Sequence, residues 1–122
     1  TGADFSSLYN FAITSKTLLT VATKEMVFPF EFGNVLCEGN RIIKMEEKPN
    51  INVEILSGIY VCSPEILDII PDDEYYGIDH LINYMLKNNL SISRYVLKEY
   101  WLDIGRADSY EEAQKMYKDN LI

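Results

Sequence analysis

The chain has 122 residues, the length of one ordinary domain, and 48% of them are hydrophobic, which is enough to build a buried core. Its 11 basic and 19 acidic residues give a net charge of −8. Because phosphate contacts need clustered lysine and arginine, this charge excludes a typical nucleic-acid partner. No apolar run is long enough to cross a membrane, so we expect no membrane partner either.

The first elements along the chain are a helix, a strand and a hairpin. Residues 4–14 predict a short helix capped by Asp4. Its apolar face is expected to hold Phe5, Leu8, Tyr9 and Phe11. Residues 18–26 are rich in β-forming side chains and predict a strand. Residues 31–49 predict a hairpin, because two alternating runs flank a turn cluster that contains Gly39.

The rest of the chain alternates strands and helices. Residues 55–63 are apolar on both faces and predict a central strand. The pattern then predicts helices at 64–70 and 79–89, strands at 91–97 and 100–104, and a last helix at 108–119 that Asp108 opens with a capping box. His80, in the first turn of its helix, is expected to be structural. Strands, helices and one hairpin together indicate an α/β fold with a mixed sheet.

Cys37 and Cys62 lie far apart inside apolar runs, without the spacing of a metal site. This placement favours buried free thiols in a reducing compartment, so we expect a cytoplasmic protein.

Three motifs are not explained by packing alone: EEKP (Glu46–Pro49), SGIYVCSPEIL (Ser57–Leu67) and WLDIGRADSYEEA (Trp101–Ala113). In this order, and after FGNV and EGNRIIKM, they resemble the sugar-phosphate nucleotidylyltransferases. That family includes glucose-1-phosphate thymidylyltransferases and mannose-1-phosphate guanylyltransferases. The resemblance covers nearly the whole chain, and it implies a Rossmann-like mixed sheet flanked by helices.

The resemblance implies that residues 1–122 form the C-terminal half of the catalytic domain, which binds the sugar phosphate and the metal. The family's Gly-rich nucleotide-binding loop and its first metal-binding aspartate, both in the N-terminal half, are absent, and Asp4 is a helix cap rather than a replacement. We therefore expect an incomplete fragment that is inactive alone. Its exposed strand edges favour association into a homo-oligomer.

Enzymes of this family transfer a nucleotidyl group from a nucleoside triphosphate to a sugar-1-phosphate, giving a nucleotide sugar and pyrophosphate. The attacking oxygen is already anionic, so positioning and charge neutralisation by Mg²⁺ and basic side chains replace a general base. Mg²⁺ prefers oxygen ligands, often one or two carboxylates. The resemblance assigns one of these catalytic metal ligands to Asp103. Without it, an aspartate before Ile104 and Gly105 is ordinarily a turn or capping residue.

The resemblance places the catalytic Lys48 near the sugar phosphate and Glu47 near the sugar hydroxyls. The alternative for both is a solvated, charged strand end. Gly33, Ser57 and Gly58 are assigned to backbone that approaches the sugar. For Gly33 the alternative is a bulge or bend in the hairpin strand.

Trp101 is the only tryptophan, and it either lines the sugar pocket or packs in the core. Arg106 stands where the family usually has threonine, and we have no physical account that makes it catalytic.

Two alternatives to an enzyme remain: a non-catalytic regulatory or assembly homologue that keeps the fold, and an unrelated α/β binding domain. Retention of Asp103 and Lys48 favours the enzyme. The nucleobase is read by the absent half, and the subfamily resemblance favours guanine with mannose or an amino sugar over thymine with glucose.

Overall fold

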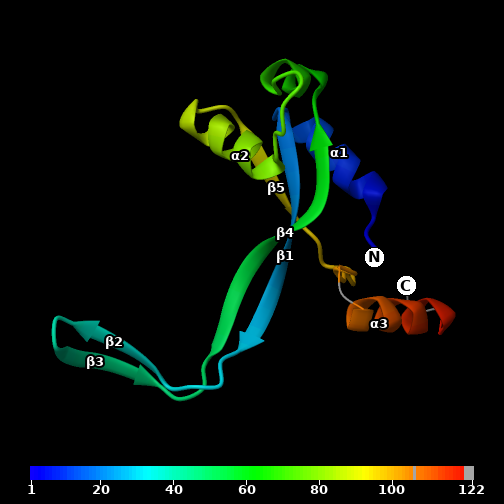
Figure 1. The fold of residues 1–122 in the computed structure, drawn as a ribbon. Helices are drawn as coiled ribbons and strands as arrows, with labels where there is room; N and C mark the ends of the chain where they lie inside the picture. The colour runs from blue at the N-terminus through cyan, green and yellow to red at the C-terminus, as the bar shows by residue number, and fades with distance from the viewer. Residues whose placement is uncertain (106, 120–122) are drawn as a thin grey trace. The chain divides into compact units, whose positions relative to one another are not determined.

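A computed structural model of the chain describes residues 1–105 and 107–119. The chain forms two compact units, which Figure 1 shows as ribbons. The first, here the main unit, contains Thr1–Lys24 and Leu56–Ile122, and the second, the hairpin unit, contains Glu25–Ile55.

Helix α1 (Phe5–Ser15) opens the main unit, as the sequence predicts. The carboxylate of Asp4 caps it by accepting the Ser7 N–H over 3.0 Å. The buried face differs from the predicted one, because Leu8 and Ala12 are buried while Phe5 and the other predicted aromatics are exposed. Residues four apart share one face of a helix, and in α1 the buried pair is Leu8 and Ala12 instead of the larger aromatic residues.

The main sheet has the strand order β4-β1-β5. Strands β1 (Leu19–Pro29) and β5 (Ile92–Val96) are parallel, with Leu19 opposite Ile92. Within the described residues, the predicted central strand, β4 (Asn50–Cys62), is therefore at one end of the order, and β1 is central. The prediction of a central position was wrong because a run that is apolar on both faces does not require a neighbouring strand on each side.

Two apolar clusters fill the main unit, one on each face of the sheet. Leu19 and Val21 of β1 belong to one cluster, while Ala22 belongs to the other, as the alternation of a strand requires. The first cluster is completed by Ile66, Leu81 and Met85 and the second by Leu8 and Leu97. Figure 1 shows α1 and α2 on opposite sides of these strands. This is the α/β arrangement that the sequence predicts.

The remaining helices differ in detail from their predictions. The segment η1 (Pro64–Ile69) is a 3₁₀-helix, and α2 (Ile78–Lys87) begins one residue earlier than predicted. Helix α3 (Ala107–Lys118) also begins earlier, so Asp108 lies inside the first turn instead of capping it. No helix in the described ranges is long and apolar enough to span a membrane.

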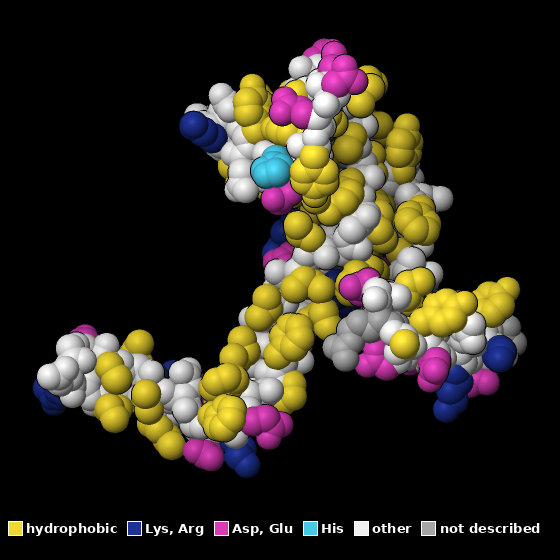
Figure 2. Space-filling model, viewed as in Figure 1, with side chains coloured by type: hydrophobic (Ala, Val, Ile, Leu, Met, Phe, Trp, Pro, Cys, Tyr) yellow, Lys and Arg dark blue, Asp and Glu magenta, His cyan; other side chains and the backbone are white. Residues whose placement is uncertain are grey.

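The hairpin unit carries the predicted hairpin, with β2 (Asn34–Glu38) antiparallel to β3 (Arg41–Glu46). Gly39 makes the turn with φ of 57°, and a bulge lies between Leu36 and Cys37. No side chain of residues 25–55, all of which the structure describes, is buried. Figure 2 shows many apolar side chains on the surface of this ribbon.

Both cysteines are free thiols, as predicted, but both are exposed rather than buried. Cys37 lies on β2, all of whose residues are exposed within the described hairpin unit, and Cys62 is the last residue of β4. An apolar neighbourhood in sequence buries a cysteine only where another element packs on that strand.

Candidate active site

The predicted site residues divide between the two units. Ser57, Gly58, Trp101 and Asp103 lie in the main unit, and Gly33, Glu47 and Lys48 lie in the hairpin unit. The WLDIG segment was predicted to form a short strand at 100–104, but these residues have no regular secondary structure. Its backbone is instead fixed by individual hydrogen bonds.

Trp101 and Ser57 are brought together in the main unit. The indole N–H of Trp101 donates to the Ser57 carbonyl over 3.0 Å, and the buried Ser57 hydroxyl donates to the Ala22 carbonyl over 2.8 Å. The half-buried Trp101 ring also packs against the cluster of Leu8, Ala22 and Leu97. This packing agrees with the core alternative for Trp101, while its role toward a sugar stays a prediction.

Gly58 follows Ser57 with φ of 77°, a left-handed conformation that favours glycine. An added Cβ would meet no atom of the described residues within 4 Å, so space does not explain the glycine. The backbone conformation does, because a side chain at this φ would be strained. Gly58 is exposed, and it directly follows the Ser57 carbonyl that accepts the Trp101 N–H.

Asp103 is exposed at the end of the WLDIG segment. Its Oδ1 accepts the Gly105 N–H over 3.2 Å, which is the turn geometry expected of an aspartate before a helix. Within residues 1–105 and 107–119, Oδ2 accepts no hydrogen bond, and no cluster of three or more His, Cys, Asp or Glu side chains could hold a metal. The turn geometry of Asp103 is therefore observed, and its side chain is exposed. Arg106 lies outside the described residues.

The segment before Asp103 is held by a residue that sequence reasoning missed. The Lys24 ammonium donates to the carbonyls of Leu97, Lys98 and Glu99 over 3.3, 3.4 and 2.7 Å. Lys24 follows the buried first half of β1. It belongs to no motif, so the sequence gives no reason to distinguish it from any other strand residue. Only the fold, which places β5 beside β1, reveals its partners.

Tyr100 adds a second set of anchors. Its carbonyl accepts hydrogen bonds from the Gly2 N–H over 3.1 Å and the Thr1 hydroxyl over 2.9 Å. Its phenol donates to the Glu112 carboxylate in α3 over 3.2 Å. Partial burial, and then this bond and charge, raise the pKa of Tyr100 above its ordinary value. The residues just before Asp103 are thus tied to the N-terminus, to β1 and to α3.

Gly33 and Glu47 lie together in the hairpin unit. A Cβ on Gly33 would stand 3.1 Å from Glu47 Oε2 and 3.3 Å from the Met45 methyl group. The missing side chain therefore makes room for the Glu47 carboxylate, which was itself predicted to bind sugar hydroxyls. The register irregularity of the hairpin lies between Leu36 and Cys37 and not at Gly33, while a bend in the chain beside Gly33 stays open as the alternative.

Lys48 is exposed and has φ of 43°, a conformation that is uncommon for a lysine. It lies between β3 and β4, where the Pro49 carbonyl accepts the Phe30 N–H over 3.1 Å. This left-handed residue lies where the chain leaves β3. Its role toward a phosphate stays a prediction.

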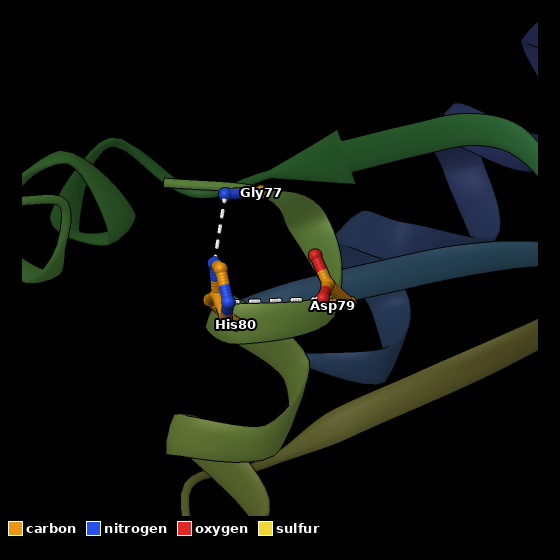
Figure 3. Close-up of polar contacts among 3 residues, drawn as sticks. All are labelled: Gly77, Asp79 and His80. Atoms are coloured by element: carbon orange, nitrogen blue, oxygen red, sulfur yellow. Dashed lines mark hydrogen bonds and ion pairs between the residues drawn. The ribbon is translucent and has the colours of Figure 1, made fainter. Parts of the chain in front are cut away.

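His80 has a structural role, as predicted. Figure 3 shows its Nδ1 facing Gly77, whose N–H donates to it over 3.2 Å, while Nε2 lies 3.9 Å from the Asp79 carboxylate. Because glycine has no side chain, this is half of a capping box at the start of α2. Tyr75 and Tyr76 place their ring centroids 6.2 and 5.7 Å from the imidazole. Hydrogen bonding and ring contacts explain His80 without a ligand.

Comparison with known proteins shows a family match over almost the whole chain. Residues 1–120 match the sequence profile of the family described as nucleotidyl transferase. The chain belongs to the nucleotidyl transferase family. This membership confirms, at the level of the family, the resemblance that the ordered motifs indicate.

Two curated members of the nucleotidyl transferase family illustrate the similarity. A protein of Arabidopsis thaliana described as mannose-1-phosphate guanylyltransferase 3 is 28% identical over 118 residues, covering 93% of this chain and 35% of its own length. A glucose-1-phosphate adenylyltransferase of Lachnospira eligens is 31% identical over 122 residues, covering 90% of this chain and 28% of its own. The chain spans between 23% and 49% of the length of the curated relatives it matches.

A solved structure shows the same fold. The crystal structure of a glucose-1-phosphate thymidylyltransferase from Bacillus anthracis in complex with sucrose aligns with a TM-score of 0.63 and 22% identity, over 96% of this chain and 50% of that one. The mixed α/β fold with helices flanking the sheet is therefore that of nucleotidyl transferases.

Proposed function

We propose that this chain is the sugar-phosphate- and metal-binding half of a sugar-1-phosphate nucleotidylyltransferase. The observation that carries the proposal is the family match over residues 1–120, which includes the EEKP and WLDIG motifs. The names of the relatives, which pair guanylyl or adenylyl transfer with a sugar-1-phosphate, support the same reaction class. The missing Gly-rich loop would then belong to the nucleotide-binding half.

The reaction joins two anions. An oxygen of the sugar-1-phosphate forms a bond to the α-phosphorus of the triphosphate, and the bond from that phosphorus to the pyrophosphate oxygen breaks. Because no proton has to leave the nucleophile, the protein's part is to align the reactants and to offset their charge.

Asp103 fits the part of a Mg²⁺ ligand in its donor chemistry. The residue is exposed, one carboxylate oxygen accepts the Gly105 N–H, and the other accepts no hydrogen bond within the described ranges. Mg²⁺ usually takes only one or two protein carboxylates and completes its shell with water and substrate phosphates. When bound, the ion would supply charge neutralisation for the phosphates. The turn at Gly105 limits the directions in which the carboxylate can point.

The hairpin unit would supply the contacts to the sugar phosphate. The Lys48 ammonium is a compact exposed charge suited to a phosphate oxygen. The Glu47 carboxylate, beside Gly33, can accept hydrogen bonds from sugar hydroxyls. These two roles explain why a lysine and a glutamate stand at the bend between two strands.

The test uses the complete catalytic domain, in which the nucleotide-binding half precedes this chain. Pyrophosphate release is assayed with Mg²⁺ over four nucleoside triphosphates and several sugar-1-phosphates, because the relatives differ in both. For the active pair, Asp103→Asn should lower kcat by about 100- to 1,000-fold, the loss of several kcal/mol of charge stabilisation.

Asp108→Asn is the matched control, since it removes an exposed carboxylate five residues away in the first turn of α3. It should retain most of the activity. Full turnover in Asp103→Asn would leave Asp103 as a turn residue only. Absence of turnover with every pair would favour a non-catalytic homologue that keeps the fold.

A further inference from the structure

Lys24 stands at the last position of β1 that belongs to the main unit, and its side chain is half-buried. Its Nζ reaches the carbonyl oxygens of Leu97, Lys98 and Glu99 over 3.3, 3.4 and 2.7 Å. These carbonyls are consecutive in sequence, so one ammonium holds a continuous piece of backbone.

The number of donors on the Lys24 ammonium equals the number of carbonyl acceptors around it. An ammonium has three N–H donors and no acceptor, which matches the number of carbonyls around it. The carbonyls need such a partner because the strand ladder ends here: the Leu97 N–H donates to the Thr23 carbonyl over 2.8 Å, and residues 98–103 form no strand. Backbone groups that leave a ladder must find other partners. Hydrogen bonds from a charged donor are stronger than neutral ones.

The segment that Lys24 holds leads directly to the predicted metal ligand. Trp101, two residues after Glu99, donates its indole N–H to Ser57. Asp103, two residues further, is fixed by its own turn with Gly105. Individual hydrogen bonds therefore hold the backbone between Leu97 and Asp103 in place of a helix or strand. The bonds from Lys24 come at the start of this segment.

We propose that Lys24 is the positioning residue that holds the Leu97–Glu99 carbonyls and so presents Asp103 in the direction its ligand requires. This inference rests on the proposed metal role of Asp103. Lys24 does not contact substrate in this proposal, because its three donors are occupied by backbone oxygens. Its effect passes through the segment, in the way that residues behind a metal ligand commonly tune the site.

The first test is independent of activity and uses Trp101, the only tryptophan, as a reporter on the segment. Lys24→Met keeps the apolar stem and removes the donors. Its tryptophan emission should shift to longer wavelength, and quenching by acrylamide should increase. Lys87→Met, which removes an exposed lysine from the last turn of α2, should change neither. An unchanged spectrum in a folded Lys24→Met protein would overturn the anchoring.

The second test uses the complete catalytic domain and the Mg²⁺ dependence of pyrophosphate release. The half-saturating Mg²⁺ concentration should rise by about 10- to 100-fold in Lys24→Met, as for other residues that orient a metal ligand. A mere loss of folded protein lowers the maximal rate without moving this concentration. Lys24→Arg, which keeps a charged multiple donor, should recover part of the shift, and it serves as the readable variant where Lys24→Met fails to fold.

The two failures are distinguishable. An unmoved Mg²⁺ curve in Lys24→Met, together with an inactive Asp103→Asn, would overturn the positioning role of Lys24 while the proposed function stands. Full activity in Asp103→Asn would instead overturn the metal role of Asp103, and with it the positioning claim, whatever the fluorescence shows.

Discussion

The indole N–H of Trp101 donates a hydrogen bond to the backbone carbonyl of Ser57 across 44 positions of sequence, over 3.0 Å. The Ser57 hydroxyl in turn donates to the Ala22 carbonyl in β1. The loop after β5 is thereby joined through β4 to the central strand of the main sheet. Two residues that the resemblance assigned to a sugar pocket thus have a structural role as well.

Replacement of Trp101 by phenylalanine should destabilise the chain. The change keeps an aromatic ring in the cluster but leaves the Ser57 carbonyl without its donor, so the free energy of unfolding should fall by about 1–3 kcal/mol. Urea unfolding followed by far-UV circular dichroism measures this. Tyr117→Phe on the exposed side of α3 is the control and should leave the midpoint in place. Equal midpoints for both variants would contradict a structural role for the bond.

A methyl group on Gly33 should disturb the sugar contacts with little effect on folding. The new Cβ would meet the ends of two flexible side chains, Glu47 and Met45, which can move aside. If Glu47 binds the sugar, Gly33→Ala should raise KM for the sugar-1-phosphate by about 2- to 10-fold, the worth of one hydrogen bond. Gly2→Ala, whose Cβ would meet nothing within 4 Å, is the control in the complete catalytic domain. An unchanged KM would remove both residues from the sugar site.

Local rules were sufficient for much of the fold. The cap at Asp4, the Gly39 turn and the alternation of the hairpin depend on a few neighbouring residues, and each lies where the pattern predicts. Strand order was not readable in this way. The apolar run of β4 fits either a central strand or an edge strand that is covered on both faces by other elements.

In the candidate site, too, some residues could be predicted from sequence and others could not. Family motifs pointed to Asp103, Lys48 and Glu47, because the order of motifs along the chain can be recognised without knowing the fold. Lys24 could not be found from sequence, since its three carbonyl partners lie more than 70 positions away and are backbone groups that every residue carries. A residue that positions a loop through backbone atoms leaves no side-chain pattern to read.

The Asp4 cap should make helix α1 sensitive to acid. Hydrogen bonds from the Ser7 hydroxyl and N–H lower the pKa of Asp4 below its ordinary value. A carboxyl group with a lowered folded-state pKa stabilises the fold above its unfolded pKa of about 3.9, and this contribution is lost as the pH falls through the lower folded-state value.

Asp4→Asn keeps a capping oxygen but does not titrate. The natural chain should therefore lose its advantage in unfolding free energy over Asp4→Asn as the pH falls below about 3.9, the ordinary pKa of an aspartate. Denaturation series at several pH values measure it. Parallel pH profiles for the two proteins would show that the cap is not electrostatic.

Removal of the His80 imidazole should weaken the start of α2. The Gly77 N–H would lose its acceptor, but both residues are near solvent, so His80→Ala should cost only about 0.5–1 kcal/mol. His80→Glu is the informative partner, because a glutamate at this third helical position can accept the same N–H and favours the helix N-terminus. It should match or exceed the natural stability. A loss as large as that of alanine would mean that the tyrosine ring contacts, rather than the cap, are what His80 provides.

The chain by itself should self-associate through the hairpin unit. Val35 and Cys37 share one face of β2, and their partners Met45 and Ile42 lie on the same face of the ribbon; Val35, Ile42 and Met45 are all exposed. A two-stranded ribbon with an open apolar face is marginal alone and gains by burying that face against another copy. Light scattering should therefore show a mass that increases with concentration. Met45→Lys places a charge on the face and should restore the monomer, whereas Asn40→Lys adds the same charge at the turn and should not. A natural chain that stays monomeric at high concentration would contradict the prediction.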